Sequence, residues 1–145
     1  MRFTIPFYGH ENIRSLHPKT IEITKESRLT VNGDCIVGVK ADYGCNDIPD
    51  RMKMLLQNSK SHVRCTIMVK DFSFKVQGKG NNKLTLKNPH DIVIRKSSFV
   101  CPRTLATNCD SASDDIPRQM IRLLQDPDTR GIFIIEVTWI IFEKA

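Results

Sequence analysis

The sequence of 145 residues lacks several features that define common protein classes. No apolar run approaches the roughly 20 residues needed to span a bilayer, and no tract has low complexity. The first residues lack the apolar core of a secretory signal peptide. The five cysteines are odd in number and never have C-x-x-C spacing, which argues against a disulfide framework and a zinc ribbon. These absences predict a cytoplasmic domain without a membrane partner.

The glycine-rich motifs that cradle phosphate in nucleotide-binding proteins are also absent. Neither G-x-x-x-x-G-K-S/T nor G-x-G-x-x-G occurs, and no helical pattern follows Gly78-Lys79-Gly80. The metal-binding spacings H-x-H and H-E-x-x-H do not occur either. The motifs therefore identify no enzyme class and no cofactor, and they leave open whether the protein is an enzyme.

One segment of the chain occurs twice. Asp47–Gln57 and Asp115–Gln125 are identical at seven of eleven positions, at an offset of 68 residues. Asp, Pro and Leu all suit the start of a helix, so convergence explains part of the match. The shared spacing of Met, Leu-Leu and Gln favours duplication of a strand–strand–helix–strand unit. We expect one domain, residues 1–145, with an internal duplication at approximately 20–69 and 91–141.

Hydrophobic periodicity predicts a strand-rich α+β fold with helices at 47–57 and 115–125. Two related units would form a barrel-like or strongly curved sheet with two helices, because closure protects the edges of short strands. An open sheet with both helices on one face is the alternative. The segment 35–41 is expected to run antiparallel to the strand at 20–24. A change of apolar phase at 70–71 indicates a bulge or bend, and a basic β-hairpin is predicted at 72–88. The last strand is expected at 133–141, after shorter strands at 63–69, 92–94 and 103–109.

The N-terminal part of the sequence resembles an archaeal family of uncharacterised proteins, domain of unknown function 371. The matching residues are Gly9-His10, Asn12, His17-Pro18, Thr20, Glu22, Thr24, Leu29-Thr30 and the run from Gly33 to Val39. A second matching block comprises Ser98, Arg103-Thr104-Leu105 and the helical segment 116–124. The resemblance covers most of the chain and implies an archaeal, cytosolic protein, but it implies no activity.

The matching residues include the candidates for a ligand-binding or catalytic site: His10, His17, Glu22, Asp34 and Arg103. His10, His17 and Glu22 would suit zinc or iron, and without a metal they could move a proton near neutral pH. Arg103 stands 68 residues after Cys35 and could supply an anion partner from the second half. The alternative is structural, with His17-Pro18 and Gly33-Asp34 in turns and Glu22 paired with a lysine.

Positive charge is concentrated in the middle of the chain. Residues 60–103 contain ten basic and two acidic side chains, whereas the whole chain has a net charge of +6. Four exposed lysines are predicted to share one face of the hairpin: Lys75, Lys79, Lys83 and Lys87. They could bind nucleic acid or another polyanion, or merely keep a strand edge soluble. No aromatic residue lies among them, so this face is not expected to stack bases.

Overall fold

The computed structural model describes residues 1–30 and 32–139. The strands are β1 (Arg2–Tyr8), β2 (Thr20–Thr24), β3 (Ile36–Gly38), β4 (Ser61–Val69), β5 (Phe72–Lys79), β6 (Asp91–Arg95), β7 (Thr104–Ala106) and β8 (Arg130–Trp139). The α-helices are α1 (Asp50–Leu56) and α2 (Arg118–Leu124), and the short 3-10 turns η1 (Cys45–Asp47) and η2 (Ser113–Asp115) precede them. No helix within the described residues is long and apolar enough to cross a membrane.

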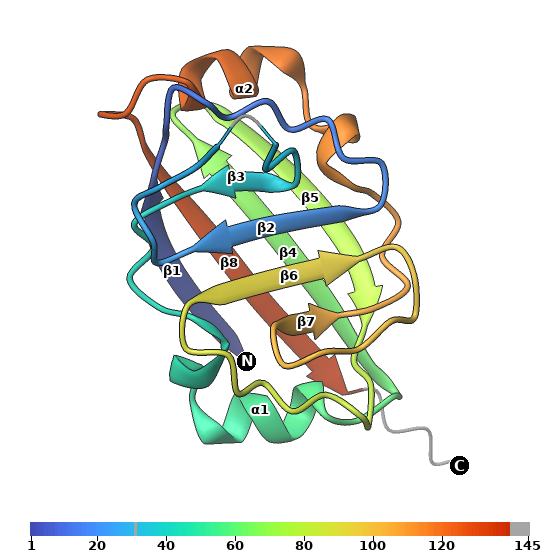
Figure 1. Cartoon of the computed structure of the whole chain (residues 1–145). Coiled ribbons are helices and arrows are strands. Elements are labelled where there is room, and N and C mark those ends of the chain that lie inside the picture. Colours follow the sequence, from blue (N-terminus) through green and yellow to red (C-terminus); the bar gives the residue numbers. More distant parts are fainter. Residues whose placement is uncertain (31, 140–145) are drawn as a thin grey trace.

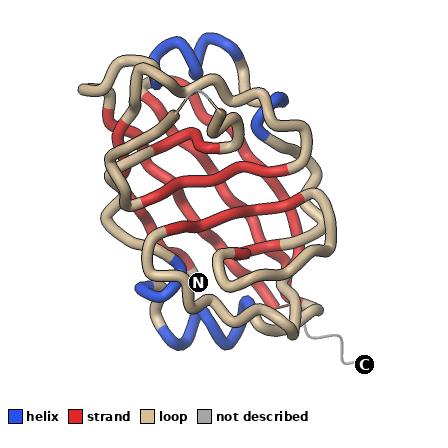
Figure 2. Tube along the Cα trace, viewed as in Figure 1, coloured by secondary structure: helices blue, strands red, loops and turns tan. Residues whose placement is uncertain are grey.

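The strands form two four-stranded sheets that pack face to face (Figure 1). Sheet A has the order β1-β8-β4-β5 and is antiparallel throughout. Sheet B has the order β3-β2-β6-β7, with an antiparallel centre and a parallel pair on each side. Figure 2 shows the helices at opposite ends of the sandwich, where they close the space between the sheets.

The expectation of a barrel-like or strongly curved sheet is wrong. The alternation of apolar residues is correct, but each sheet buries its inner face against the other and needs no closure. Neither sheet closes on itself; single antiparallel bridges, Tyr8–Val39 and Lys79–Thr107, connect the sheets at two corners. The chain remains strand-rich with two helices, but its architecture is a two-layer sandwich. The open-sheet alternative required both helices on one face of the sheet, whereas they lie at opposite ends of the sandwich.

Several local expectations are also corrected. β3 runs parallel to β2, because the chain crosses over through residues 25–35 before it pairs. The hairpin at 72–88 does not form; β5 pairs with β4, and residues 80–90 lead into sheet B. The phase change at 70–71 is the turn between β4 and β5, where Lys70 has φ 53°. The predicted last strand extends to residues 140–141, which lie outside the described residues. The sequence Val31-Asn32-Gly33-Asp34 also predicts a turn, and Val31 lies outside the described residues.

One large aromatic ring fills the space where sheet A meets sheet B. The ring of Phe7 is completely buried, and a Cβ at Gly38 or Gly131 would collide with it. Gly38 belongs to sheet B and Gly131 to sheet A, so the absence of a side chain at both positions makes room for one large ring. This packing holds the two sheets together beside β1.

The order of elements in the first half recurs in the second. At the centre of sheet A, Thr66 pairs with Ile134, 68 positions later; at the centre of sheet B, Glu22 pairs with Val93, 71 positions later. Equivalent residues of the two halves therefore pair with each other at the centre of each sheet, as they do when a two-fold axis relates the halves. The difference of three residues arises because the connection from β6 to β7 is shorter than that from β2 to β3. Whether the halves arose by duplication of approximately 20–69 and 91–141 stays a prediction.

Candidate functional sites

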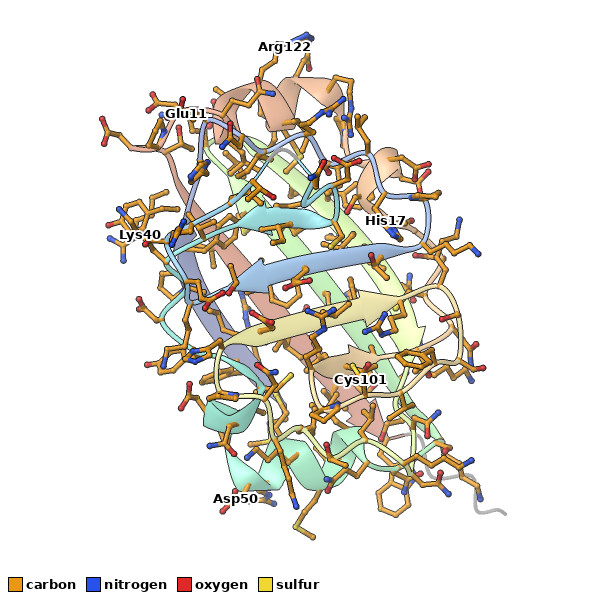
Figure 3. The ribbon with its side chains drawn as sticks, viewed as in Figure 1. Glu11, His17, Lys40, Asp50, Cys101 and Arg122 are labelled. Atoms are coloured by element: carbon orange, nitrogen blue, oxygen red, sulfur yellow. The ribbon has the colours of Figure 1, made fainter. Side chains whose placement is uncertain are left out.

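His10 and His17 serve the loop that leads from β1 to β2. The Nδ1 atom of His10 accepts a hydrogen bond from the Asn12 amide at 3.0 Å. The Nδ1 atom of His17 accepts the amides of Lys19 and Thr20 at 3.1 and 3.2 Å. Both contacts cap a turn in the manner of an Asx residue. Figure 3 shows His17 near the start of β2.

The equivalent loop of the second half uses asparagine for the same contacts. Asn81 Oδ1 accepts the amide of Lys83 at 2.9 Å, as His10 accepts that of Asn12. Asn88 Oδ1 accepts the amides of His90 and Asp91 at 2.9 and 2.8 Å, in the place of His17. An amide oxygen and an imidazole nitrogen thus perform one structural task, and the histidines need no catalytic role to account for their contacts.

The structure does not gather the five candidate residues into one site. No group of three or more His, Cys, Asp or Glu side chains suited to a metal occurs among residues 1–30 and 32–139, so His10, His17 and Glu22 do not form one. The carbonyl oxygen of Asp34 accepts the amides of Leu16 and His17, while its Oδ1 atom is buried without a hydrogen-bond partner. His17 and Asp34 meet only through this backbone contact, whereas the side chains of Glu22 and Arg103 come together, with 3.7 Å between Oε2 and Nη1.

Glu22 and Arg103 belong to a polar cluster on the outer face of sheet B. The Glu22 side chain is only 5% exposed, although neither α-helix of the described residues covers this face (Figure 1), whereas that of Arg103 is 44% exposed. Arg103 Nη1 also lies 3.4 Å from Asp91 Oδ2, so one guanidinium bridges two carboxylates. Burial, followed by the charge of Asp91, raises the pKa of Glu22, although Arg103 and Cys35 oppose the shift. A carboxyl in this setting can hold a proton at a higher pH than a free glutamate.

A half-exposed thiol, Cys101, lies beside this cluster in the segment before β7 (Figure 3). Its Sγ atom is 3.3 Å from Arg95 Nη2 and 3.6 Å from Thr104 Oγ1. Burial is the largest single effect and raises the pKa of the thiol. Hydrogen bonds from Thr104, Arg103 and Arg95 together outweigh it, so the pKa of Cys101 is lowered. By contrast, burial and the charge of Glu22 raise the pKa of Cys35 to about 11.

The outer face of sheet A carries the largest concentration of positive charge along the strands. Alternation along the strands points five exposed basic side chains and one acidic side chain outward from this face. The face therefore has a net charge of +4, compared with +6 for the whole chain. We call this surface the basic face; its charged residues are Arg2, Arg64, Lys75, Lys79, Arg130 and Glu136. Neither helix of the described residues covers this surface, because both lie at the ends of the sandwich (Figures 1 and 2).

Neighbouring strands bring these charges into rows across the basic face. Arg2, Glu136, Arg64 and Gln77 lie side by side in one row, and Thr4, Ile134, Thr66 and Lys75 in the next. Arg64 forms an ion pair with Glu136 at 3.1 Å. Two shallow hollows, of about 240 and 300 Å³, share Arg2, Arg64 and Glu136 in their linings. Basic and hydroxyl side chains there can donate several hydrogen bonds to one anion.

The four predicted lysines divide between two places. Lys75 and Lys79 point outward from β5 on the basic face, and the loop that follows contains Lys83 and Lys87. All four are exposed, as predicted from parity, although the predicted hairpin is wrong. Sequence reasoning missed Arg2, Arg64 and Arg130 as partners of Lys75, because three other strands supply them. It also missed Cys101, whose neighbours Arg95 and Thr104 become close only through the parallel pairing of β6 and β7.

The fold defines a strand-rich, two-layer protein with one polar cluster and one basic face. The chain belongs to the family described as domain of unknown function DUF371, whose model matches residues 5–138. It is similar to an uncharacterised protein, MJ0206, of Methanocaldococcus jannaschii, with 39% identity over 126 residues. The match covers 87% of this chain and 93% of that protein. The family and its archaeal relative agree with the resemblance in the N-terminal residues.

Proposed function

We propose that this protein binds nucleic acid, a polyanion, through the basic face of sheet A. The observation that carries the proposal is the net charge of +4 on that face, with Glu136 as its one acidic strand residue. Phosphate contacts supply most of the affinity in binding that does not depend on sequence. The exposed hydroxyl groups of Thr4 and Ser73 add hydrogen-bond donors between the charges.

The predicted hairpin site is thereby replaced by a surface built from four strands. Lys75 and Lys79 remain in the proposed site, whereas Lys83 and Lys87 do not, because residues 80–90 lead away from sheet A. This difference permits a matched experiment. The double variants Lys75→Ser/Lys79→Ser and Lys83→Ser/Lys87→Ser change the net charge equally, at exposed positions, in different parts of the fold.

Binding to a fluorescent oligonucleotide should be measured against salt concentration. Each phosphate contact contributes roughly 0.7–0.9 to the slope of log K against log salt. Loss of Lys75 and Lys79 should weaken binding and reduce the slope by about 1.5, whereas loss of Lys83 and Lys87 should change both much less. Equal effects of the two double variants would show that total charge, rather than the basic face, determines binding. Wild-type binding without salt dependence would remove the proposal.

The polar cluster of sheet B favours a second candidate, a site that binds or transforms a small ligand. The observation that favours it is a buried carboxyl, Glu22, on an outer face, in contact with the half-exposed guanidinium of Arg103. Thermal-shift screening with small metabolites would test it. A ligand that stabilises the wild type but neither Glu22→Gln nor Arg103→Met supports the site, and equal stabilisation of all three contradicts it.

We infer a cytoplasmic location for either function. Cys35, Cys45, Cys65, Cys101 and Cys109 are all free thiols, which suits a reducing compartment. Fractionation of cells that produce the protein would test this inference; recovery with the membranes would contradict it.

A further inference from the structure

An apolar groove lies between helix α1 and the end of strand β8. It has a volume of about 580 Å³ and is lined by Met1, Arg51, Met54, Leu55, Asn58 and Trp139. The side chains of Met54 and Trp139 are unusually open for large apolar groups, since these residues are 72% and 46% exposed. Trp139 is the single tryptophan of the chain.

The groove adjoins the basic face. Met1 lines both the groove and the hollow that contains Arg2, Arg64 and Glu136. Thr138, which also lines that hollow, precedes Trp139 on β8, but alternation points Thr138 to the basic face and Trp139 to the inner side of sheet A, so the groove lies around the end of the sheet. Arg51 adds a positive charge to the lining of the groove itself. A flexible chain of phosphates on the basic face would turn around the end of sheet A, past Met1, to bring a base to the exposed aromatic ring.

We propose that the groove receives an unpaired base that stacks on Trp139, so that the nucleic acid bound by the basic face is single-stranded. The inference rests on the proposed function. Stacked bases of a duplex present only their edges and cannot lay a π-face on the ring, whereas a flexible single strand can turn one base into the groove. Arg51 and Met54 border the position of the base, and Arg2 and Arg64 hold the phosphates that follow it. No aromatic ring is needed among the lysines of β5.

The intrinsic fluorescence of Trp139 reports on this contact without a label. The experiment titrates the whole protein, at low salt, with single-stranded oligo-dT, with a duplex of equal length and with heparin, which has no bases. We expect oligo-dT to quench the fluorescence strongly and heparin to leave it nearly unchanged. Trp139→Ala should weaken oligo-dT binding about five-fold or more, since stacking on one aromatic side chain contributes that much. Trp139→Phe should retain most of the affinity, because it retains a ring.

The outcomes separate this inference from the proposed function. One outcome is that oligo-dT binds with salt dependence but without quenching, and with equal affinity for wild type and Trp139→Ala. That result would overturn the stacking site and leave the basic face in place. Failure of every polyanion to bind would overturn both. A change of fluorescence with protein concentration alone would assign the groove to a second copy of the chain and also overturn the inference. Unchanged heparin binding by Trp139→Ala would show that the variant is folded.

Discussion

Glu22 pairs directly with Val93 at the centre of sheet B, and the two residues hold equivalent positions in the two halves. Some contacts recur in both halves: Gly44 and Ala112 each donate an amide hydrogen bond to an aspartate three residues later, at 2.9 Å. On the outer face of sheet B the chemistry of the halves differs. Glu22 replaces a valine, and Arg103 replaces a cysteine, Cys35. Each half folds with an uncharged residue at one of these two positions. Folding alone therefore does not explain Glu22 and Arg103, and their roles can be tested by substitution.

The first prediction concerns the pH dependence of stability due to Glu22. Its pKa in the folded protein is raised, chiefly by burial, above the ordinary value of about 4.3. The protonated form is therefore favoured by folding, and this contribution is lost as pH rises from the ordinary value through the raised pKa. We expect Glu22→Gln to gain stability relative to wild type across that window. Urea unfolding at a series of pH values would measure the difference.

A control for this prediction is Glu11→Gln, which changes an exposed carboxyl in the first loop. Its effect should vary much less with pH than that of Glu22→Gln. If the stability difference between Glu22→Gln and wild type stays constant with pH, or changes in favour of wild type as pH rises, then Glu22 is ionised without cost. The Arg103 ion pair would then outweigh burial.

The second prediction compares two half-exposed thiols on the same face of sheet B. The pKa of Cys101 is lowered and that of Cys35 is raised to about 11, so Cys101 carries more thiolate at neutral pH. Reaction of the folded protein with dithiodipyridine should show one fast thiol. Cys101→Ser should abolish the fast phase, and Cys35→Ser should preserve it. Arg95→Met should slow the phase at pH 7, because it removes a hydrogen-bond donor at 3.3 Å. A fast phase lost with Cys35 would contradict the assignment.

The third prediction tests whether His17 is a turn-capping residue. Because Asn88 makes the same two contacts in the second half, His17→Asn should unfold at nearly the wild-type midpoint. His17→Ala should lose about 1 kcal/mol, the usual loss for a side chain that caps backbone amides. Denaturant unfolding would measure both. If His17→Asn proved as destabilised as His17→Ala, the imidazole would have a role that the hydrogen bonds do not explain.

The sequence was sufficient to predict most elements but not their assembly. Alternation located the strands around Ile21, Val63 and Phe133, and the repeated Ile-Pro pairs marked both helices. The helices are shorter than predicted because Pro49 and Pro117 have extended ψ angles, 140° and 133°, and stand before the first helical residue. Periodicity reports which side of a strand is apolar, but it does not report which strand lies beside it. The choice between barrel and sandwich depends on that pairing.

The candidate sites, like the fold, could be predicted only in part from the sequence. Arg103 could be placed near Glu22 through the offset of the repeat, because Arg103 is the equivalent of Cys35, which contacts Glu22. The histidines could not be recognised as caps, since the equivalent residues are asparagines and the shared contacts appear only in the folded loops. The basic face was hidden because its arginines come from β1, β4 and β8, which are far apart in the chain.

The last prediction is an increase in affinity. Glu136 is the one acidic strand residue on the basic face, and it holds Arg64 at 3.1 Å. Glu136→Gln removes a charge that repels phosphate and frees the guanidinium of Arg64, while the amide oxygen still offers it a hydrogen bond. Exposed ion pairs contribute roughly 0.2–1 kcal/mol, so nucleic-acid binding should strengthen about 1.4- to five-fold. Glu26 lies just after the end of β2, a strand of sheet B, and away from the basic face. Glu26→Gln makes the same charge change there and should increase the affinity less. An oligonucleotide titration that shows equal gains for both variants would reduce the effect to net charge.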